Sequence, residues 1–320
     1  MNDTSLLALL EEAGDAFVSG EHISRRLGVS RTAIWKQIRK LEAEGYRIEA
    51  VPRRGYRLVG KPERLTLQAL LAKLRTKTFG RCMRLYDTVG STQDVLHEWA
   101  KEGAPEGALV IAERQTKGRG RLGRTWVSPA GKGVWMSLLL RPALPLALAP
   151  QLTLLAAVAL ARGLQQVAAL PIGIKWPNDL LVDGKKVCGV LLESSAEDER
   201  LVYVAAGIGI SVNLEAADFP EDLADRAISL KMACGRELDR GEVVAAVLSS
   251  FEELYGLYRE QGFAPIRLLW EALAVSLHEP AEIRTPAGEV RGIPRGLDDY
   301  GGLLVERTDG TIAPVYAILV

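Results

Sequence analysis

A short stretch of the chain concentrates cations and glycines in a way that suits anion binding. Residues 118–124 read Gly-Arg-Gly-Arg-Leu-Gly-Arg. Glycines let a backbone approach a ligand closely, and arginines donate paired hydrogen bonds to carboxylate or phosphate oxygens. The sequence therefore predicts a loop that closes over an anion and shields a reactive bond from water. A solvated basic loop without a ligand is the alternative.

The same loop matches G-x-G-x-x-G, but its surroundings do not fit dinucleotide binding. That motif runs directly out of a strand and into a helix. Here the polar residues 113–117 separate the loop from an expected strand at 108–112, and residues 125–129 are poor helix formers. The chain also lacks the Gly-Lys-Ser/Thr of a Walker loop and the catalytic motifs of kinases.

A lysine at the end of an apolar strand forms the second candidate group. Lys175-Trp176-Pro177-Asn178-Asp179 follows the expected strand at 172–174. A lysine fixed there is well placed to stabilise developing negative charge. Asn178 and Asp179 add an amide and a carboxylate, and Asp179 could hold Mg²⁺ directly or through water. No protein nucleophile is evident, because Cys188 lies in an apolar strand and is predicted to be core.

The first 61 residues show a different pattern, in which helices precede a basic hairpin. Ser19 and Ser30 are expected to cap the second and third helices, and Gly28 ends the second. Two strands are expected at 46–51 and 55–59. Residues 20–61 carry 11 Lys or Arg and 4 Asp or Glu, a net charge of +7 on a chain of zero formal charge. This arrangement predicts a winged helix-turn-helix that binds DNA, and a protein-contact module is the alternative.

The third helix and the hairpin tip supply the expected DNA contacts. Their donors suit phosphates and base edges. Trp35 is either an apolar contact to DNA, an internal packing residue or part of a dimer contact. The candidates are Ser30, Arg31, Thr32, Trp35, Lys36, Arg39, Arg53 and Arg54.

Composition narrows the class of protein. A chain of 320 residues, 48% of them hydrophobic, favours two or three globular domains. Cys82, Cys188 and Cys234 are too dispersed for a zinc site or a disulfide framework. The acidic N-terminus does not resemble a signal peptide. The apolar run at 143–161 contains two prolines and is predicted to be a buried helix from about residue 150, so we expect a cytoplasmic protein with no membrane partner.

Four motifs together carry a family resemblance. Ser91-Thr92-Gln93, the loop at 118–124, the Lys175–Asp179 segment and Gly207-Ile208-Gly209-Ile210-Ser211-Val212-Asn213 occur in this order. The chain is similar to the bifunctional biotin protein ligases that also repress biotin operons, over essentially its whole length. Two departures stand out: Gln93 stands where the family often has Asn, and residues 317–320 replace a Gly-rich turn and a further strand.

The resemblance implies a two-step reaction that uses ATP and Mg²⁺. Biotin is adenylated to biotinyl-5′-AMP, and a lysine of a biotin carboxyl carrier protein then takes the biotinyl group. Lys175, Arg119 and Arg121 would be catalytic. The residues at biotin would be Ser91, Thr92, Gln93, Gln115, Arg119, Gly120, Arg121 and Lys175. Those at ATP or the adenylate would be Gly118, Arg121, Arg124, Asn178, Asp179 and Asn213, with Asp179 as a magnesium ligand.

The implied fold is α+β and multidomain. A winged helix-turn-helix would occupy residues 1–61, before a linker that begins at Lys61. A mixed α/β ligase domain, related to class II synthetases and lipoate ligases, would span 62–268, and a small SH3-like β-barrel 269–320. A ligand-promoted homodimer would bind operator DNA. A ligand-sensing regulator without turnover and a lipoate-type ligase are the alternative functions.

Overall fold

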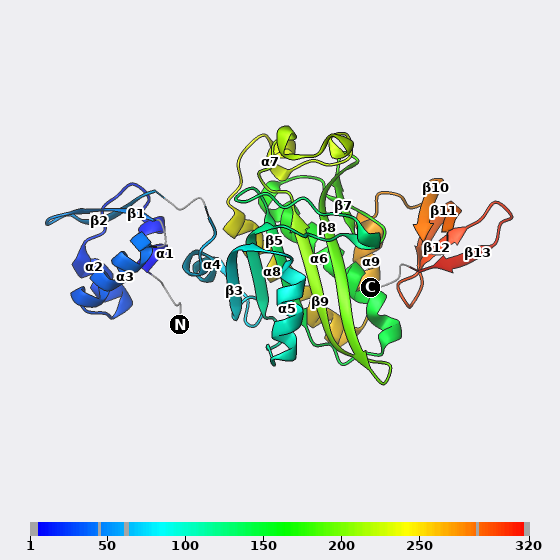
Figure 1. Cartoon of the computed structure of the whole chain (residues 1–320), viewed down its shortest axis with the longest axis horizontal. Coiled ribbons are helices and arrows are strands. Elements are labelled where there is room, and N and C mark those ends of the chain that lie inside the picture. The colour runs from blue at the N-terminus through cyan, green and yellow to red at the C-terminus, as the bar shows by residue number, and fades with distance from the viewer. Residues whose placement is uncertain (1–5, 44–45, 61–63, 286–287, 317–320) are drawn as a thin grey trace. The chain divides into compact units, whose positions relative to one another are not determined.

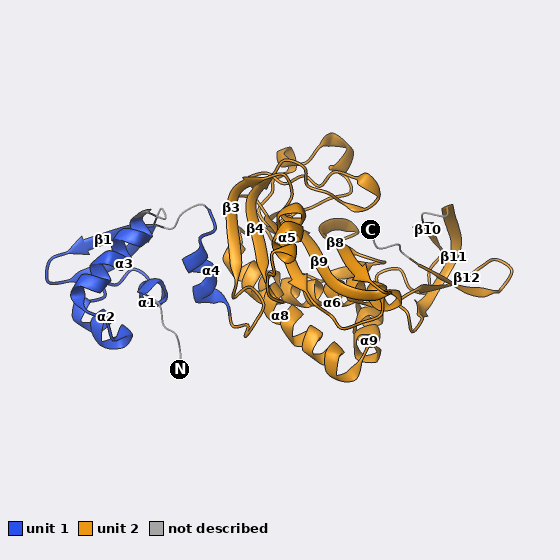
Figure 2. Cartoon of the chain, turned by 60° about the horizontal axis from the view of Figure 1, so that its bottom comes forward, with its two compact units in different colours: residues 1–74 blue, residues 75–320 orange. Residues whose placement is uncertain are grey.

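The computed structural model describes residues 6–43, 46–60, 64–285 and 288–316, and these fall into two compact units. The first unit comprises residues 1–74 and the second residues 75–320 (Figure 2). This division is coarser than the three expected domains, and residues 61–63 of the expected linker lie outside the described residues. The boundaries at 61 and 268 therefore stay predictions.

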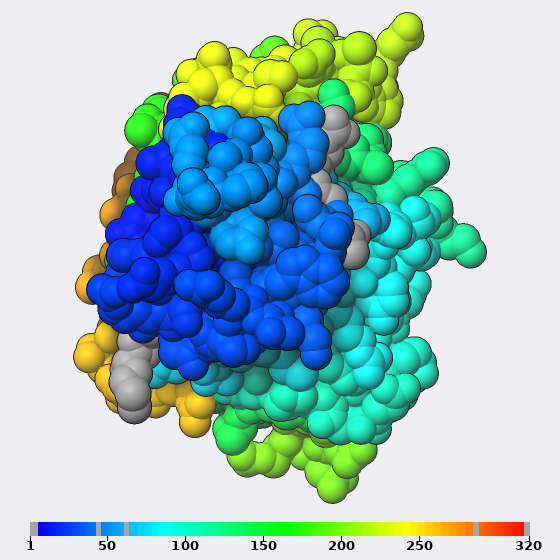
Figure 3. Space-filling view, turned by 90° about the vertical axis from the view of Figure 1, so that its left-hand side faces the viewer, coloured from blue at the N-terminus to red at the C-terminus, as the bar shows by residue number. Residues whose placement is uncertain are grey.

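The first unit is a helix-turn-helix followed by a hairpin, as the sequence predicts. Its core joins one face of each helix to the hairpin, and Ile34, Ile38 and Leu41 of the third helix are buried in it. Ser19 caps the second helix by accepting from the His22 N–H, 3.1 Å away. Figure 3 shows one face of this unit in blue. Its elements are α1 (Leu6–Glu12), α2 (Gly20–Leu27), α3 (Arg31–Ala43), β1 (Arg47–Val51), β2 (Gly55–Gly60) and α4 (Leu67–Lys73).

A seven-stranded mixed sheet organises the second unit, in the order β3-β4-β5-β9-β8-β7-β6 (Figure 1). Only β3 and β4 pair in parallel among its described strands. The strands are β3 (Met83–Val89), β4 (Leu109–Gln115), β5 (Val134–Leu140), β6 (Gly173–Lys175), β7 (Asp179–Val182), β8 (Lys185–Glu197) and β9 (Arg200–Ile210).

Helices pack against this sheet and fix its strands. α5 (Thr92–Lys101) packs on β4, β5 and β9 through a cluster that includes Leu96 and Ala205. α6 (Ala149–Ala168) packs against β8 and against the helices α8 (Arg240–Gln261) and α9 (Ala264–Leu273). The unit also contains α7 (Leu230–Cys234), with short 3-10 turns at Arg121–Gly123, Leu146–Leu148, Ala216–Asp218 and Glu221–Leu223.

The apolar run that begins near residue 143 forms a core helix. By length and composition, residues 146–168 could cross a membrane, but 72% of the most apolar window is buried within the fold. Fifteen of the 20 residues of α6 are buried, and the helix packs against α8 and α9. The prediction of a buried helix from about residue 150 is therefore confirmed.

The last part of the chain is a small antiparallel β domain. Its sheet has the order β10-β11-β12-β13, with bounds Ala281–Thr285, Gly288–Leu297, Leu303–Glu306 and Ile312–Val315. The domain is joined to α6 by the buried Gln151, whose Nε2 donates to the Asp299 carbonyl at 2.7 Å. The expected shortening at residues 317–320 lies outside the described residues.

Candidate active site

Where β8 and β9 pair, three glycines let side chains of other elements lie directly on the sheet. Gly189 lies opposite Gly209, and Gly207 lies opposite Leu191. Cross-strand partners share a face, and so do residues two apart on one strand, so all three glycines lie on the same face. Because the glycines have no side chains, Gln93, Trp126 and Lys186 lie directly on them, and we call this covered, glycine-lined part of the sheet the trough.

An indole ring lies over two of these glycines. A Cβ added to Gly209 would overlap the ring of Trp126 far inside van der Waals contact, and one added to Gly189 would lie 2.9 Å from the same ring. The Trp126 Nε1 atom is buried, and no described residue hydrogen-bonds to it. Trp126 therefore forms a flat wall of the trough with a donor still available. Nothing in the sequence patterns marked this tryptophan as a site residue.

Replacing Gly209 by alanine should damage ligand binding more than folding. The Cβ would displace the indole, and overpacking of this kind costs about 1–3 kcal/mol. We expect the KM for biotin or ATP to rise at least roughly tenfold, which corresponds to about 1.4 kcal/mol. Gly256→Ala is the matched control, because nothing lies within 4 Å of its added Cβ. Steady-state kinetics and thermal melts of both variants measure this, and an unchanged KM in Gly209→Ala would remove the trough from the site.

A polar network lies beside the trough at the beginning of α5. Thr92 donates its backbone N–H to Gln115 Oε1 at 2.8 Å, and its hydroxyl lies 2.8 Å from the Ser137 hydroxyl. Gln115 Nε2 donates to the Ser128 hydroxyl at 3.2 Å. Ser91 caps α5 and is buried. The structure therefore brings the expected residues Ser91, Thr92 and Gln115 together as preorganised hydrogen-bonding groups.

Gln93 is held differently from these three residues. Its Nε2 lies 3.1 Å from the Leu191 carbonyl and 3.4 Å from the Ala205 carbonyl. Its side chain also fills the space over Gly207, where an added Cβ would lie 2.6 Å from Gln93 Cδ. Gln93 thus shapes the end of the trough, and its amide N–H groups are engaged by the sheet.

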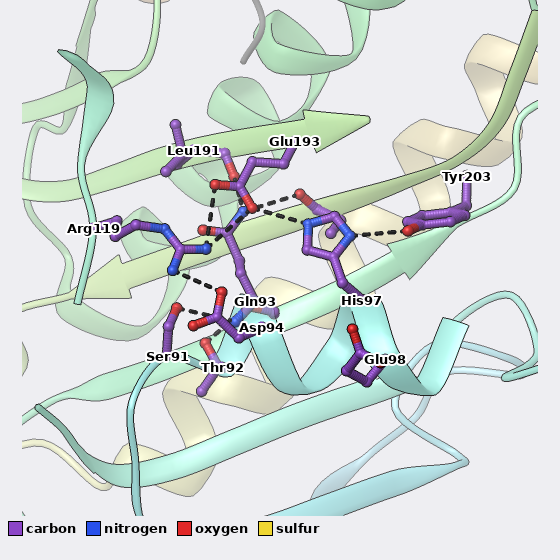
Figure 4. Close-up of polar contacts among 12 residues, drawn as sticks. Ser91, Thr92, Gln93, Asp94, His97, Glu98, Arg119, Leu191, Glu193 and Tyr203 are labelled. Carbon is purple, nitrogen blue, oxygen red and sulfur yellow. Dashed lines mark hydrogen bonds and ion pairs between the residues drawn. The ribbon is translucent and has the colours of Figure 1, made fainter. Parts of the chain in front are cut away.

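The glycine-rich loop folds back on itself beside the trough. The Gly120 N–H donates to the Arg124 carbonyl at 2.7 Å, and the Trp126 N–H donates to the Gly118 carbonyl at 2.9 Å. Arg119 forms ion pairs with Asp94 and Glu193 (Figure 4). Arg124 is exposed, and its charge contributes to lowering the pKa of the neighbouring Arg121 guanidinium.

Arg121 lies near the Asn178 side of the site. Its Nη1 donates to Asn178 Oδ1 at 3.3 Å, and Asn178 Nδ2 donates to the Val190 carbonyl at 2.6 Å. Burial lowers the pKa of the Arg121 guanidinium from its ordinary value, and Asp179 opposes that change. A shallow pocket, partly open to solvent, is lined by Arg121 together with Trp176, Leu191 and Gly301.

Two lysines flank Asp179, and the sequence interpretation identified only one of them. Lys186 Nζ lies 2.6 Å from Asp179 Oδ1 and 5.0 Å from the centre of the Trp126 ring. Lys175 lies opposite Asp179 in the β6–β7 pairing, at the sheet edge, and its side chain is exposed. Lys186 therefore approaches the trough more closely, while Lys175 lies at its outer end.

Asn213 follows the end of β9, and its side chain is hydrogen-bonded within the fold. Its Nδ2 donates to the Leu238 carbonyl at 2.8 Å, and its Oδ1 accepts from the Leu238 N–H at 3.0 Å. Its backbone N–H donates to the Lys132 carbonyl at 2.6 Å. A buried ion pair of 2.7 Å between Arg240 and Glu113 joins the beginning of α8 to β4. Because the Asn213 amide is bound to Leu238, the backbone around Asn213, and not its side chain, is expected to face adenine.

The described residues do not form a metal cage. They contain no group of three or more His, Cys, Asp or Glu that could hold a metal ion, and Asp179 is paired with Lys186. Mg²⁺ usually keeps several waters and binds through one or two carboxylates together with substrate phosphates. Asp179 as a magnesium ligand therefore stays a prediction, and the ion would arrive with the triphosphate.

The expected DNA-contacting residues share an exposed surface in the first unit. All eight side chains are exposed, and Ser30 caps α3 by accepting from the Ala33 N–H at 3.2 Å. Trp35 is 53% exposed, with the Arg39 guanidinium 5.3 Å from its ring centre, so it does not pack inside this unit. Arg54 stacks over Phe17 at the wing, 4.3 Å from the ring centre.

Comparisons with known proteins identify all three parts of the chain. The biotin/lipoate A/B protein ligase family matches residues 85–211, an HTH domain matches 3–57, and the biotin protein ligase C-terminal domain matches 279–317. The biotin protein ligase of Aquifex aeolicus in complex with biotin and ATP has a TM-score of 0.64 and 33% identity, over 75% of this chain and 96% of that one.

Two relatives match from end to end. The bifunctional ligase/repressor BirA of Bacillus subtilis (strain 168) is 47% identical over 98% of this chain and 96% of its own length. The protein of the same name from Escherichia coli (strain K12) is 31% identical over 97% of this chain and 93% of its own length. The chain therefore belongs to the biotin protein ligase family, with the bifunctional ligase/repressors as its full-length relatives.

Proposed function

We propose that this protein joins biotin to a lysine of a biotin carboxyl carrier protein through biotinyl-5′-AMP and represses biotin synthesis genes by binding operator DNA. One observation carries the ligase proposal: Lys186 pairs with Asp179 and Arg121 donates to Asn178, so two cations lie at the residues expected to bind the adenylate. Such a pair of cations attracts anions.

The first step joins two anions, so charge stabilisation matters more than a general base. A carboxylate oxygen of biotin attacks the α-phosphorus of ATP, a new P–O bond forms, and pyrophosphate leaves with the electrons of the broken bond. Lys186, which pairs with Asp179, and Arg121, which donates to Asn178, stabilise the negative charge that gathers at phosphorus. Asp179 holds the Lys186 ammonium in place until the phosphate arrives.

The second step transfers the biotinyl group. The neutral amine of the acceptor lysine attacks the acyl carbon, an amide bond forms, and AMP leaves with the electrons of the acyl C–O bond. The loop at 118–124 keeps the mixed anhydride from water between the two steps. Ser91, Thr92, Gln93 and Gln115 fix the biotin end, and the Trp126 indole separates it from the adenylate end.

Repression follows from the same ligand. When acceptor protein is scarce, biotinyl-AMP stays bound, favours a homodimer, and the dimer binds a two-fold operator in the cytoplasm. Acceptor protein consumes the adenylate and lifts repression. The exposed Arg and Lys side chains of α3 and the wing support the DNA-binding part of this proposal.

Mass spectrometry of an acceptor domain tests the ligase proposal directly. Incubation with the protein, biotin and Mg·ATP should add the mass of one biotinyl group. Omission of ATP, replacement of biotin by lipoate, and a Lys→Arg acceptor are the three controls. If lipoate is transferred instead, the lipoate-type alternative is right. If no adenylate forms with either acid, the protein is a sensor without turnover.

A further inference from the structure

The guanidinium of Arg119 ends between two carboxylates that belong to different elements. Its Nη1 lies 2.7 Å from Asp94 Oδ1 on α5, and its Nη2 lies 3.3 Å from Glu193 Oε2 on β8 (Figure 4). Arg119 itself comes from the glycine-rich loop. One loop side chain thus bridges a helix and a strand that lie far apart in the sequence.

Glu193 is held from its other side by a histidine. His97 Nε2 lies 2.9 Å from Glu193 Oε2, and His97 Nδ1 lies 3.0 Å from the Tyr203 hydroxyl. A carboxylate only accepts hydrogen bonds, so Nε2 carries the proton and donates to Glu193. In the neutral imidazole, Nδ1 then accepts from Tyr203. The row Tyr203–His97–Glu193–Arg119 therefore has one consistent donor order.

This row keeps Glu193 charged although it is half-buried. Burial would raise the pKa of the Glu193 carboxyl, but the hydrogen bond from His97 and the charge and hydrogen bond of Arg119 outweigh it and hold that pKa below its ordinary value. Burial would lower the pKa of the Arg119 guanidinium, but the hydrogen bond that Arg119 donates to Asp94 and the charges of Glu193 and Asp94 outweigh burial and raise that pKa. Charge-assisted hydrogen bonds of this kind are stronger than neutral ones.

The contacts of Arg119 with Asp94 and Glu193 lie next to residues that are expected to bind biotin. Asp94 follows Gln93 in α5, and Glu193 is two residues beyond Leu191, whose carbonyl accepts from Gln93. Figure 4 shows Arg119 reaching these carboxylates beside Gln93. A loop tied to both α5 and β8 therefore lies next to the residues expected at biotin.

We infer that Asp94, Glu193 and His97 are positioning residues that hold Arg119, and with it residues 118–124, across the biotin pocket. We call this set with Tyr203 the arginine latch. Its role in ligation rests on the proposed function, but its effect on the loop does not. The latch residues touch neither Arg121 nor Lys186 in any described contact, so opening the latch should raise the KM for biotin and the leakage of biotinyl-AMP more than it lowers kcat for adenylation.

Limited digestion with trypsin measures how firmly the latch holds the loop, and it needs no ligand. Trypsin cleaves after arginine, and the loop contains Arg119, Arg121 and Arg124. Glu193→Gln and His97→Leu should each raise the rate of cleavage within residues 119–124 of the full chain by roughly fivefold, as expected for the loss of one partly buried charged contact. His97→Gln keeps an N–H that can reach Glu193 and should stay near the original rate. Glu98→Gln is the matched control, because Glu98 lies on the same helix and pairs with Lys101 at the surface.

The pattern of cleavage decides the inference. A selective increase at the loop in Glu193→Gln and His97→Leu, with His97→Gln and Glu98→Gln unchanged, supports the latch. Equal rates in all variants, or an increase spread over every tryptic site, would overturn it. Failure of the ligase proposal would show instead as absence of biotinyl-AMP in the unaltered protein, whatever the cleavage pattern. In an active protein, the latch also requires a higher biotin KM with a smaller change in kcat.

Discussion

Replacing Lys186 by alanine is expected to slow the formation of biotinyl-5′-AMP by roughly 10²- to 10³-fold, the loss seen when one preorganised charge-stabilising donor is removed. The ammonium stands 2.6 Å from Asp179 and 5.0 Å from the Trp126 ring centre, at the edge of the trough. Its removal leaves the Asp179 carboxylate next to the incoming phosphates, which adds repulsion to the lost attraction. Single-turnover adenylation with radiolabelled ATP measures the step separately from transfer.

Lys175→Ala is the matched comparison, because Lys175 lies opposite the same Asp179. An exposed lysine at the sheet edge contributes less to stabilising a buried transition state. We therefore expect the rate of biotinyl-5′-AMP formation to fall by less than about tenfold. A double variant Lys186→Ala with Asp179→Asn should recover part of the activity lost in Lys186→Ala, because the unpaired carboxylate is gone. If Lys175→Ala is instead the variant that loses adenylation, the catalytic role belongs to Lys175, as the family resemblance implies.

The reason Lys186 was missed lies in the strand register. In the sequence, Asp183-Gly184-Lys185-Lys186 is typical of a solvated hairpin turn. The β7–β8 pairing has a register shift between Leu180 and Leu181. The side chain of Lys186 lies against Gly189, where an added Cβ would be 3.0 Å from Lys186 Cε. Local patterns do not determine such a shift, because the pairing partner decides it.

The elements with strong local patterns were predictable. The strand expected at 108–112 is found at 109–115, because its first four residues are buried and form a continuous apolar run. The caps Ser19 and Ser30 and the left-handed Gly28 were predictable because their chemistry is local. The latch was not, since His97 and Glu193 are 96 residues apart and meet only through the packing of α5 on the sheet.

Replacing both Arg31 and Lys36 by alanine is expected to weaken operator binding by roughly 100-fold or more, since each contact to a base or phosphate contributes about 1–3 kcal/mol. Both side chains are exposed on α3, while Ile34, Ile38 and Leu41 fill the core on its opposite face. The unit should therefore fold normally without them. Ligase activity should not change, because the expected substrate-binding residues all lie in the second unit.

Fluorescence anisotropy with operator DNA at several salt concentrations measures this loss. Each phosphate contact removed lowers the slope of log K against log salt by about one unit, so an unchanged slope with weaker binding identifies base contacts. Lys101→Ala shows the effect of losing one positive charge elsewhere, because Lys101 is an exposed lysine of the second unit. Adding biotinyl-AMP to the unaltered protein tests the coupling: tighter binding to a two-fold operator than to a half-site requires the dimer. Equal affinity with and without the adenylate would separate the two activities and leave DNA binding without its proposed ligand control.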